Sequence, residues 1–151
     1  MSFLLQVARW FSDPAHWRGY DGIPQRLGEH VVMSGAATAT AIALALPVGL
    51  VLGHYGRGGA LAINVSNVGR AVPSFAILVL ALEAFGIGAK PAYLALVALA
   101  VPPILTNTYA GMRDVDPALR EAARGLGMRE LQATLRIELP LALPVIMAGI
   151  R

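Results

Sequence analysis

The chain of 151 residues contains no cysteine, which excludes disulfides and thiolate-held metal sites. Charge is also scarce: charged residues make up 14% of the sequence, whereas an ordinary soluble domain carries about a quarter. The net charge of +3 is small and the arginines lie at the edges of apolar runs, so no basic face indicates nucleic acid. The histidines His16, His30 and His54 are scattered without a ligand spacing, and we expect no metal site.

A phosphate-binding loop is missing too. The glycine-rich stretch 53–59 has neither the lysine nor the neighbouring hydroxyl of the G-x-x-x-x-G-K-[ST] pattern. The sequence also offers no catalytic His, Cys or carboxylate pair that would suit an intramembrane enzyme. We therefore expect a chain that is not an enzyme and that holds no cofactor of its own.

Long apolar runs are what the sequence has instead, with a mean hydropathy of +0.62. Residues 30–54, 71–89 and 91–112 each approach or exceed the roughly 20 residues that cross a bilayer as a helix. A fourth run, 139–151, has only 12 residues before Arg151, so we expect it to be too short to span. The chain stops as though within a helix, which predicts a fragment.

The N-terminal segment, residues 1–27, differs from the rest of the chain, which we assign to a membrane domain over 28–151. Trp10, Trp17 and Tyr20 are typical of the interfacial belt, where amphipathic rings settle. An exposed leader with no particular role fits the same residues equally well.

Prolines and small residues indicate how the apolar runs pack. The small side chains of residues 34–41 allow helix backbones to approach closely in lipid. Each proline removes a backbone donor, and we expect Pro47, Pro73, Pro102 and Pro103 to kink or break their helices. Both features suit a bundle that rearranges around a path, and they suit an ordinary compact bundle as well.

Arginines predict the orientation in the membrane. Arg57 and Arg70 bracket the link between the first two runs, and Lys90 stands alone between the second and third. Five more arginines follow the third run: Arg113, Arg120, Arg124, Arg129 and Arg136. The positive-inside rule places the first and third links in the cytoplasm, and the N-terminal segment outside.

The third link, residues 113–138, is the only long polar segment within the predicted membrane domain, and its pattern predicts two short helices. Asp116 is a suitable N-cap with Pro117 at the first helical position, and Gly125 and Gly127 supply a turn. A second helix is expected from Met128 until Pro140 breaks it. In that helix Leu131, Leu135 and Glu138 share one face. By pattern alone, an amphipathic connector lying on the membrane is an equal alternative.

The spacing of this link resembles a known family. Glu121-Ala122-Ala123, then Gly127, then Ile137-Glu138-Leu139-Pro140 resemble the EAA loop of permease subunits of ABC importers. Residues 71–76, 103–111 and 139–151 resemble the osmoprotectant branch, which imports glycine betaine, carnitine and choline.

The resemblance implies a fold and a function. The fold would be an all-α membrane protein, the MetI-like helical bundle of a type I ABC importer permease, truncated after the start of its fourth span. The helix 117–124 would be the coupling helix that docks on a separate ATPase. The implied coupling residues are Glu121, Ala122, Ala123, Arg124, Gly127, Ile137, Leu139 and Pro140.

The same resemblance implies partners and a mechanism. ATP would be bound by the ABC ATPase subunit, substrate would arrive from an extracytoplasmic binding protein, and a second permease copy would complete the path. The location would be the bacterial inner membrane, and transport would proceed by alternating access. A permease of the same fold for an amino acid is the alternative substrate class. A channel or secondary transporter acting alone would leave the loop spacing without a reason.

Four residues are candidates for a substrate pathway: Glu83, Tyr93, Asn107 and Tyr109. Glu83, the one charge inside the apolar runs, either attracts a cationic amine or reaches the outer interface, where its charge costs little. Tyr93 and Tyr109 offer aromatic faces to a quaternary ammonium. Asn107 must find a hydrogen-bond partner, for which another helix suffices.

Overall fold

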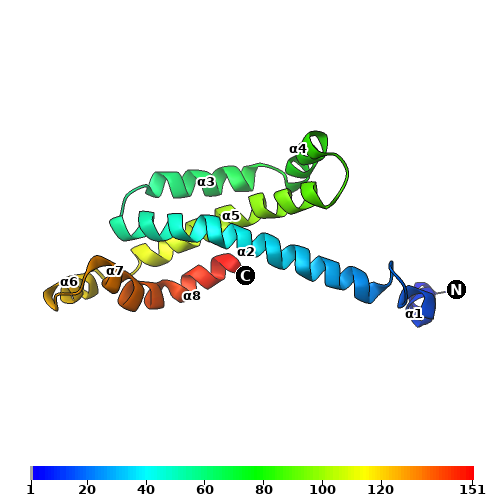
Figure 1. The fold of residues 1–151 in the computed structure, drawn as a ribbon, viewed down its shortest axis with the longest axis horizontal. Coiled ribbons are helices and arrows are strands. Elements are labelled where there is room, and N and C mark those ends of the chain that lie inside the picture. The colour runs from blue at the N-terminus through cyan, green and yellow to red at the C-terminus, as the bar shows by residue number, and fades with distance from the viewer. Residues whose placement is uncertain (1) are drawn as a thin grey trace. The chain divides into compact units, whose positions relative to one another are not determined.

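The computed structural model describes residues 2–151, except for the side chains of residues 63, 66, 70 and 74. Its elements are α1 (Phe3–Ser12), η1 (Pro14–His16), α2 (Ile23–Tyr55), α3 (Gly59–Ala71), α4 (Ser74–Phe85), α5 (Ala89–Arg113), α6 (Pro117–Gly125), α7 (Glu130–Ala133), η2 (Thr134–Glu138) and α8 (Leu139–Ile150). Within these described residues no strand occurs, which confirms the all-α class (Figure 1).

The chain divides into two compact units, Met1–Ala36 and Ala37–Arg151, and α2 contributes to both. In the first unit, η1 is capped by Asp13, whose carboxylate accepts a hydrogen bond from the Ala15 amide at 2.9 Å. Helix α1 buries none of its residues. The expected boundary between residues 27 and 28 falls inside α2, because that helix already begins at Ile23 after a turn at Gly19 and Gly22.

Small residues build the contact between α2 and α5 in the second unit. Ala37, Ala41, Ala45, Gly49 and Gly53 recur every four residues on the buried face of α2. Gly53 is the closest approach, since a Cβ added there would lie 2.4 Å from the Cβ of Met112. The backbones therefore meet almost directly, as small residues permit in lipid.

Helix α8 packs on another side of α5 by the same means. A Cβ at Gly149 would lie 2.7 Å from the Cβ of Asn107. Met112 and Val115 form a buried apolar cluster with Ala142 and Ile146 of α8. Helix α5 is thus the central helix of the unit, since α3, α4 and α8 all contact it (Figure 1).

The predicted span 71–89 is not a single helix. Helix α3 occupies residues that we had assigned to a link and ends at Ala71, and α4 then runs only from Ser74 to Phe85. Pro73 causes the break, because a proline disfavours helical geometry in the residue before it. Val72 is accordingly extended, with φ −81° and ψ 118°. The other two predicted spans, 30–54 and 91–112, lie within α2 and α5.

Pro140 does not end the last helix, contrary to our expectation. Residues Glu130–Ile150 form one helical segment of 21 residues, which is long and apolar enough to cross a membrane, as are α2 and α5. In the middle lies η2, a π-helical turn in which the Leu139 amide bonds to the carbonyl of Thr134, five residues back. Pro140 follows it in the first turn of α8. The wider turn separates the proline ring from the carbonyls that an α-helix would push against it.

Other prolines also lie inside continuous helices. Pro47 is in α2, Pro102 and Pro103 are in α5, and Pro144 is in α8. In α5, Thr106 Oγ1 donates to the Pro102 carbonyl at 2.9 Å and Asn107 Nδ2 donates to the Pro103 carbonyl at 2.9 Å. Of the four prolines expected to kink or break a helix, only Pro73 stands at a break, and the other three lie inside helices.

We predict that Gly53→Ala destabilises the protein, because its new methyl group would overlap the Cβ of Met112, which cannot move without the backbone. Overpacking of this kind costs about 1–3 kcal/mol. Gly35→Ala, on the same helix with nothing within 4 Å of the added Cβ, is the matched control. The apparent melting temperature in detergent should fall for the first variant only. Equal melting of both variants would contradict the close contact of α2 and α5.

Candidate functional site

Helix α6 follows the local rules that its sequence predicts. Asp116 Oδ1 accepts the Ala118 amide at 2.9 Å, and Pro117 occupies the first turn. At the other end, Gly127 has φ +73°. Its amide bonds to the Arg124 carbonyl at 2.9 Å, and the amide of the following Met128 bonds to the Ala123 carbonyl at 3.1 Å. This pair of bonds is a Schellman motif, the usual glycine-terminated helix end.

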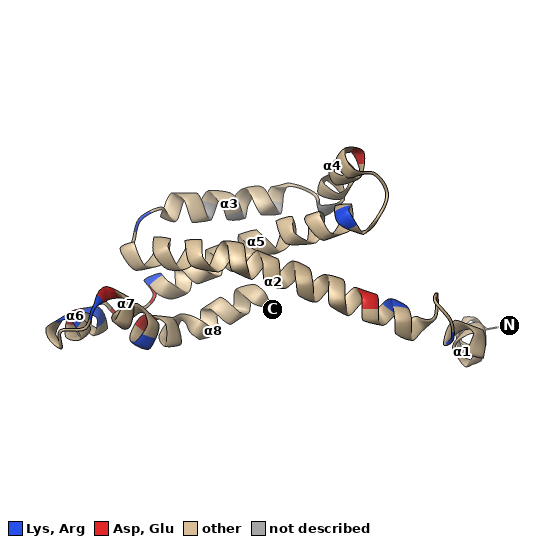
Figure 2. Cartoon of the chain, in the orientation of Figure 1, with Lys and Arg blue, Asp and Glu red and all other residues tan. Residues whose placement is uncertain are grey.

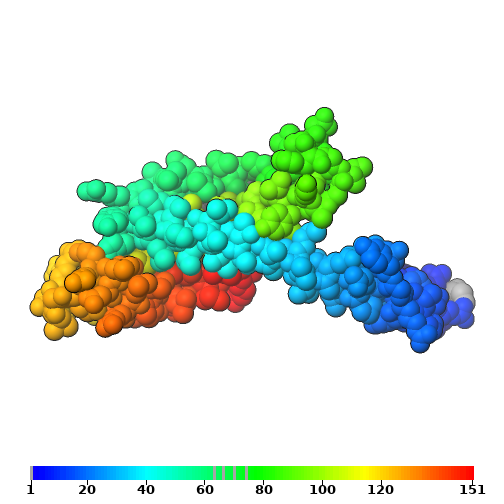
Figure 3. Space-filling model, in the orientation of Figure 1, coloured from blue at the N-terminus to red at the C-terminus, as the bar shows by residue number. Residues whose placement is uncertain are grey.

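Gly125 departs from expectation, because it lies inside α6 and has no positive φ. Only the second of the two glycines therefore turns the chain. The segment 117–138 forms one end of the second unit in the space-filling view (Figure 3). Charged residues gather on α6 and α7, whereas the central turns of α5 and α8 carry none (Figure 2).

The EAA residues do not all face the same way. Glu121, Ala122 and Arg124 are exposed, whereas Ala123 is only 1% exposed and packs inside the chain. The two alanines therefore differ in role: one leaves a small open surface, and the other fits α6 against its neighbours. Leu126, in the turn before Gly127, is 82% exposed. Sequence reasoning missed Leu126, although an apolar residue between two glycines of a polar loop was a visible signal.

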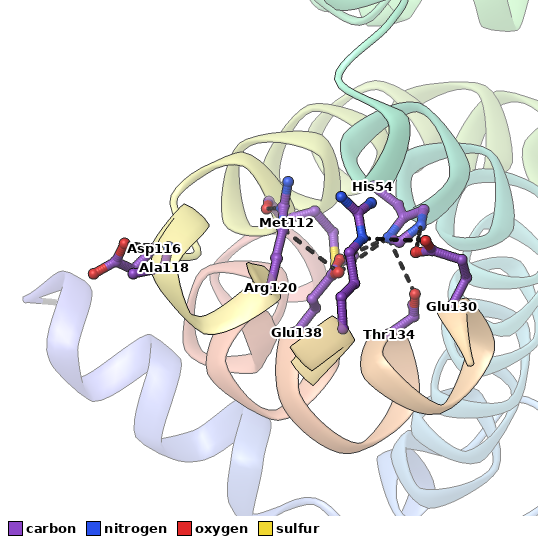
Figure 4. A network of polar contacts seen from close by, with 9 residues as sticks. His54, Met112, Asp116, Ala118, Arg120, Glu130, Thr134 and Glu138 are labelled. Atoms are coloured by element: carbon purple, nitrogen blue, oxygen red, sulfur yellow. Dashed lines mark hydrogen bonds and ion pairs between the residues drawn. The ribbon is translucent and has the colours of Figure 1, made fainter. Parts of the chain in front are cut away.

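A buried carboxylate lies beneath this loop. Glu138, at the end of η2, is 1% exposed. His54 Nδ1, from the last turn of α2, lies 2.9 and 3.1 Å from its two carboxylate oxygens. Arg120 Nε, from α6, lies 3.5 Å from Glu138 Oε1 (Figure 4). The end of α2, which is far away in the sequence, thus meets α6 and η2 at one side chain.

Further contacts extend the cluster in two directions. Thr134 Oγ1 lies 3.1 Å from His54 Nδ1, and Glu130 Oε2 lies 3.3 Å from His54 Nε2 (Figure 4). Glu130 in turn accepts a hydrogen bond from Arg124 Nε at 3.2 Å. The Glu130–Arg124 pair is exposed, and such pairs contribute only about 0–1 kcal/mol. The buried contacts of Glu138 therefore dominate the cluster.

Arg120 holds a second partner. Its Nη2 group donates to the carbonyl of Met112, in the last turn of α5. Carbonyls at the end of a helix have no partner within the helix, and an arginine satisfies them well. Arg120 thus joins α6 both to α5 and to Glu138, whereas the sequence suggested either a pairing with acidic groups of the ATPase or a marker of the inner face.

The π-helical turn explains why sequence reasoning placed Glu138 with the wrong neighbours. An uninterrupted α-helix would put Leu131 and Leu135 on the buried face of Glu138. Because η2 has a wider turn, that face continues to Ala133 instead, and the two leucines are 68% and 51% exposed. The partner His54 lies 84 residues away and gave no sequence signal.

A metal ion is not indicated by this cluster. Across residues 2–151, outside the undescribed side chains, no group of three His, Asp or Glu residues has the geometry to hold one. Both ring nitrogens of His54 are already directed at carboxylates. The arrangement is therefore a structural joint between helices, with charges that satisfy one another.

Comparison with known proteins identifies the family. Residues 32–151 match the family described as binding-protein-dependent transport system inner membrane component. The chain belongs to this family. With α2, α5 and Glu130–Ile150 each long and apolar enough to cross a membrane, it is a multi-pass protein of the bacterial inner membrane.

Several curated relatives are similar to this permease-family chain. The choline transport system permease protein OpuBB of Bacillus subtilis is 42% identical over 123 residues, 82% of this chain and 57% of the relative. The glycine betaine/carnitine/choline permease protein OpuCB of the same species is 39% identical over 126 residues, 83% and 58%. The osmoprotectant import permease protein OsmY of Salmonella typhimurium is 37% identical over 124 residues, 81% and 52%. The chain thus spans little more than half the length of these relatives.

The four candidate pathway residues are not brought together. Glu83 is exposed in the last turn of α4. Tyr93 is half-buried, with its hydroxyl 2.5 Å from Thr40 Oγ1 of α2. Asn107 bonds to its own helix, and Tyr109 lies beside Gly59 at the start of α3. The Tyr93 hydroxyl makes the hydrogen bond between helices that we expected Asn107 to make.

The remaining candidate coupling residues lie in the helical segment after α6. Ile137 and Leu139 are half-buried beside Glu138, and Pro140 is exposed. They belong to the part that supports α6, whereas Glu121, Ala122 and Arg124 lie at the surface. Their part in coupling remains a prediction.

We predict that Gly127→Ala loosens the end of α6, because an L-residue at φ +73° is strained by about 1–2 kcal/mol. Amide hydrogen exchange at residues 126–128 should accelerate about tenfold, the factor equivalent to 1.4 kcal/mol. Gly125→Ala is the matched control, because Gly125 is helical and nothing lies within 4 Å of an added Cβ. Unchanged exchange in Gly127→Ala would argue against the Schellman turn.

Proposed function

We propose that this chain forms the membrane-spanning part of an ATP-driven ABC importer and that α6 is its contact with a separate ATPase subunit. The observation that carries the proposal is the geometry of α6. A short, firmly capped helix at one end of the unit presents Glu121 and the small Ala122 to solvent, while its buried side is tied to α5 and η2. Such a helix suits close docking by shape, with exposed charge pairs adding little.

The proposed mechanism is alternating access. ATP closes the ATPase subunits, the coupling helices move with them, and the membrane helices open toward a substrate-loaded binding protein outside. The chain itself has no phosphate-binding loop, so hydrolysis belongs to the partner. Two permease copies, identical or related, would enclose the path between them.

The proposed substrates are small quaternary amines such as glycine betaine, choline and carnitine. Support comes from the relatives, which are named for choline, for glycine betaine/carnitine/choline and for carnitine transport. Affinity for the substrate is expected to reside mainly in the binding protein. That expectation agrees with the scattered positions of Glu83, Tyr93, Asn107 and Tyr109.

We predict that Ala122→Asp prevents the ATPase from co-purifying with the permease and lowers uptake about tenfold or more. An added carboxylate on the small docking surface would be desolvated without a partner, a cost of several kcal/mol. Ala15→Asp, at an exposed alanine of η1, is the matched control and should leave both assembly and uptake unchanged. Full assembly and uptake in Ala122→Asp would show that α6 is not the docking site.

We also predict the substrate class. Cells expressing the complete importer should accumulate labelled glycine betaine, choline or carnitine, and an excess of any substrate should compete with the others. Unlabelled histidine, an amino acid without a quaternary amine, is the control and should not compete. Competition by histidine with none by the quaternary amines would assign the permease to amino acids instead.

A further inference from the structure

Glu138 is placed to do more than stabilise the fold. Its carboxylate contacts Arg120 of α6 and His54 at the end of α2, and Arg120 also donates to the last turn of α5 (Figure 4). We propose that the buried Arg120–Glu138–His54 contact is the joint that transmits movement of α6 to the membrane helices. Arg120 and Glu138 act here as positioning residues. This inference rests on the proposed function, because it presupposes an ATPase that moves α6.

The packing of α6 supports this role. Of its nine residues only Ala123 is buried, so apolar contact alone fixes the helix weakly. Arg120 supplies two further attachments, one to the Met112 carbonyl and one to Glu138, while the exposed Arg124–Glu130 pair adds little. Arg120 is therefore the side chain of α6 that makes polar contact with both α5 and η2.

On the α2 side of the joint, several polar contacts converge on one residue. His54 is held from several directions, since Glu138 and Thr134 face its Nδ1 and Glu130 faces its Nε2. Directly before it, Gly53 packs against Met112 without room for a methyl group. A displacement of Glu138 is thus passed to the end of α2 through the polar contacts that hold His54.

The contact between Arg120 and Glu138 also has room to tighten. The Nε atom of Arg120 is buried and makes no hydrogen bond within the described residues, and its 3.5 Å distance to Glu138 is an ion-pair distance. A shift of α6 by a fraction of an ångström would form a charge-assisted hydrogen bond, which is shorter and stronger. The π-helical turn that carries Glu138 is a rare element that is frequent at functional sites.

The test uses the complete importer in proteoliposomes, with uptake and ATP hydrolysis measured in the same sample. Glu138→Gln and Arg120→Gln should each lower the amount of substrate moved per ATP hydrolysed by about 5- to 30-fold. Co-purification of the ATPase should persist, which separates the joint from the docking surface. Arg136→Gln is the matched control, because Arg136 is an exposed arginine of η2 close to Glu138 in the sequence.

The double variant Arg120→Gln/Glu138→Gln tests whether the two residues act through each other. Its ratio of uptake to hydrolysis should equal that of either single variant, because each already removes the contact. Arg120→Lys keeps the charge but cannot reach Glu138 and the Met112 carbonyl together, so its ratio should lie between wild type and Arg120→Gln. This conservative variant carries the test if Glu138→Gln fails to assemble.

Three results would overturn the proposal that this contact transmits movement of α6. The first is that uptake and hydrolysis fall together at a constant ratio, as a purely structural role would give. The second is that the single effects multiply in the double variant. The third is that Arg120→Lys and Arg120→Gln, measured separately, both keep the wild-type ratio of uptake to ATP hydrolysis. Failure of the proposed function looks different, since the wild-type permease would then neither bind an ATPase nor import substrate.

Discussion

The buried carboxylate of Glu138 is the constraint on which the loop end of the second unit depends. Removing one partner from a buried ion pair costs about 3–5 kcal/mol, so a charge buried to this degree must be held from several sides. His54 and Arg120 supply those sides, from α2 and α6. The chain must therefore bring the end of its first long helix, its loop helix and its last helical segment to one point.

Close packing of helices makes that meeting possible. Gly53 lets α2 approach α5 at Met112, and the next residue, His54, then faces η2. The same Met112 offers its carbonyl to Arg120. One residue of α5 thus anchors both the apolar contact and the polar one. The close contact that small residues allow between α2 and α5 thus brings the charged residues of the loop within reach of His54.

Local rules predicted much of this arrangement from the sequence. The N-cap Asp116, the first-turn Pro117 and the glycine turn at Gly127 follow from side-chain chemistry and backbone sterics within a few residues. The close packing of α2 was indicated by the small residues of its sequence. The resemblance to the EAA loop identified the family to which residues 32–151 belong.

Features that depend on distant contacts were not predictable in the same way. Pro73 stands at a helix break and Pro47 lies inside α2, although both stand in apolar runs, so the presence of a proline alone did not predict where a helix ends. The π-helical turn moved Leu131 and Leu135 outward, and no α-helical pattern shows such a change of register. The pairing of Glu138 with His54 joins residues 84 positions apart, which only the fold reveals.

The central claim, that α6 docks on an ATPase, is tested most directly by a cross-link. Because residues 1–151 contain no cysteine, Leu126→Cys introduces the one thiol of this segment, at the exposed end of α6. The account predicts that a short thiol cross-linker joins this position to the ATPase in the assembled importer, and that Ala15→Cys forms no such product. Assembled importer that cross-links at neither position would contradict it.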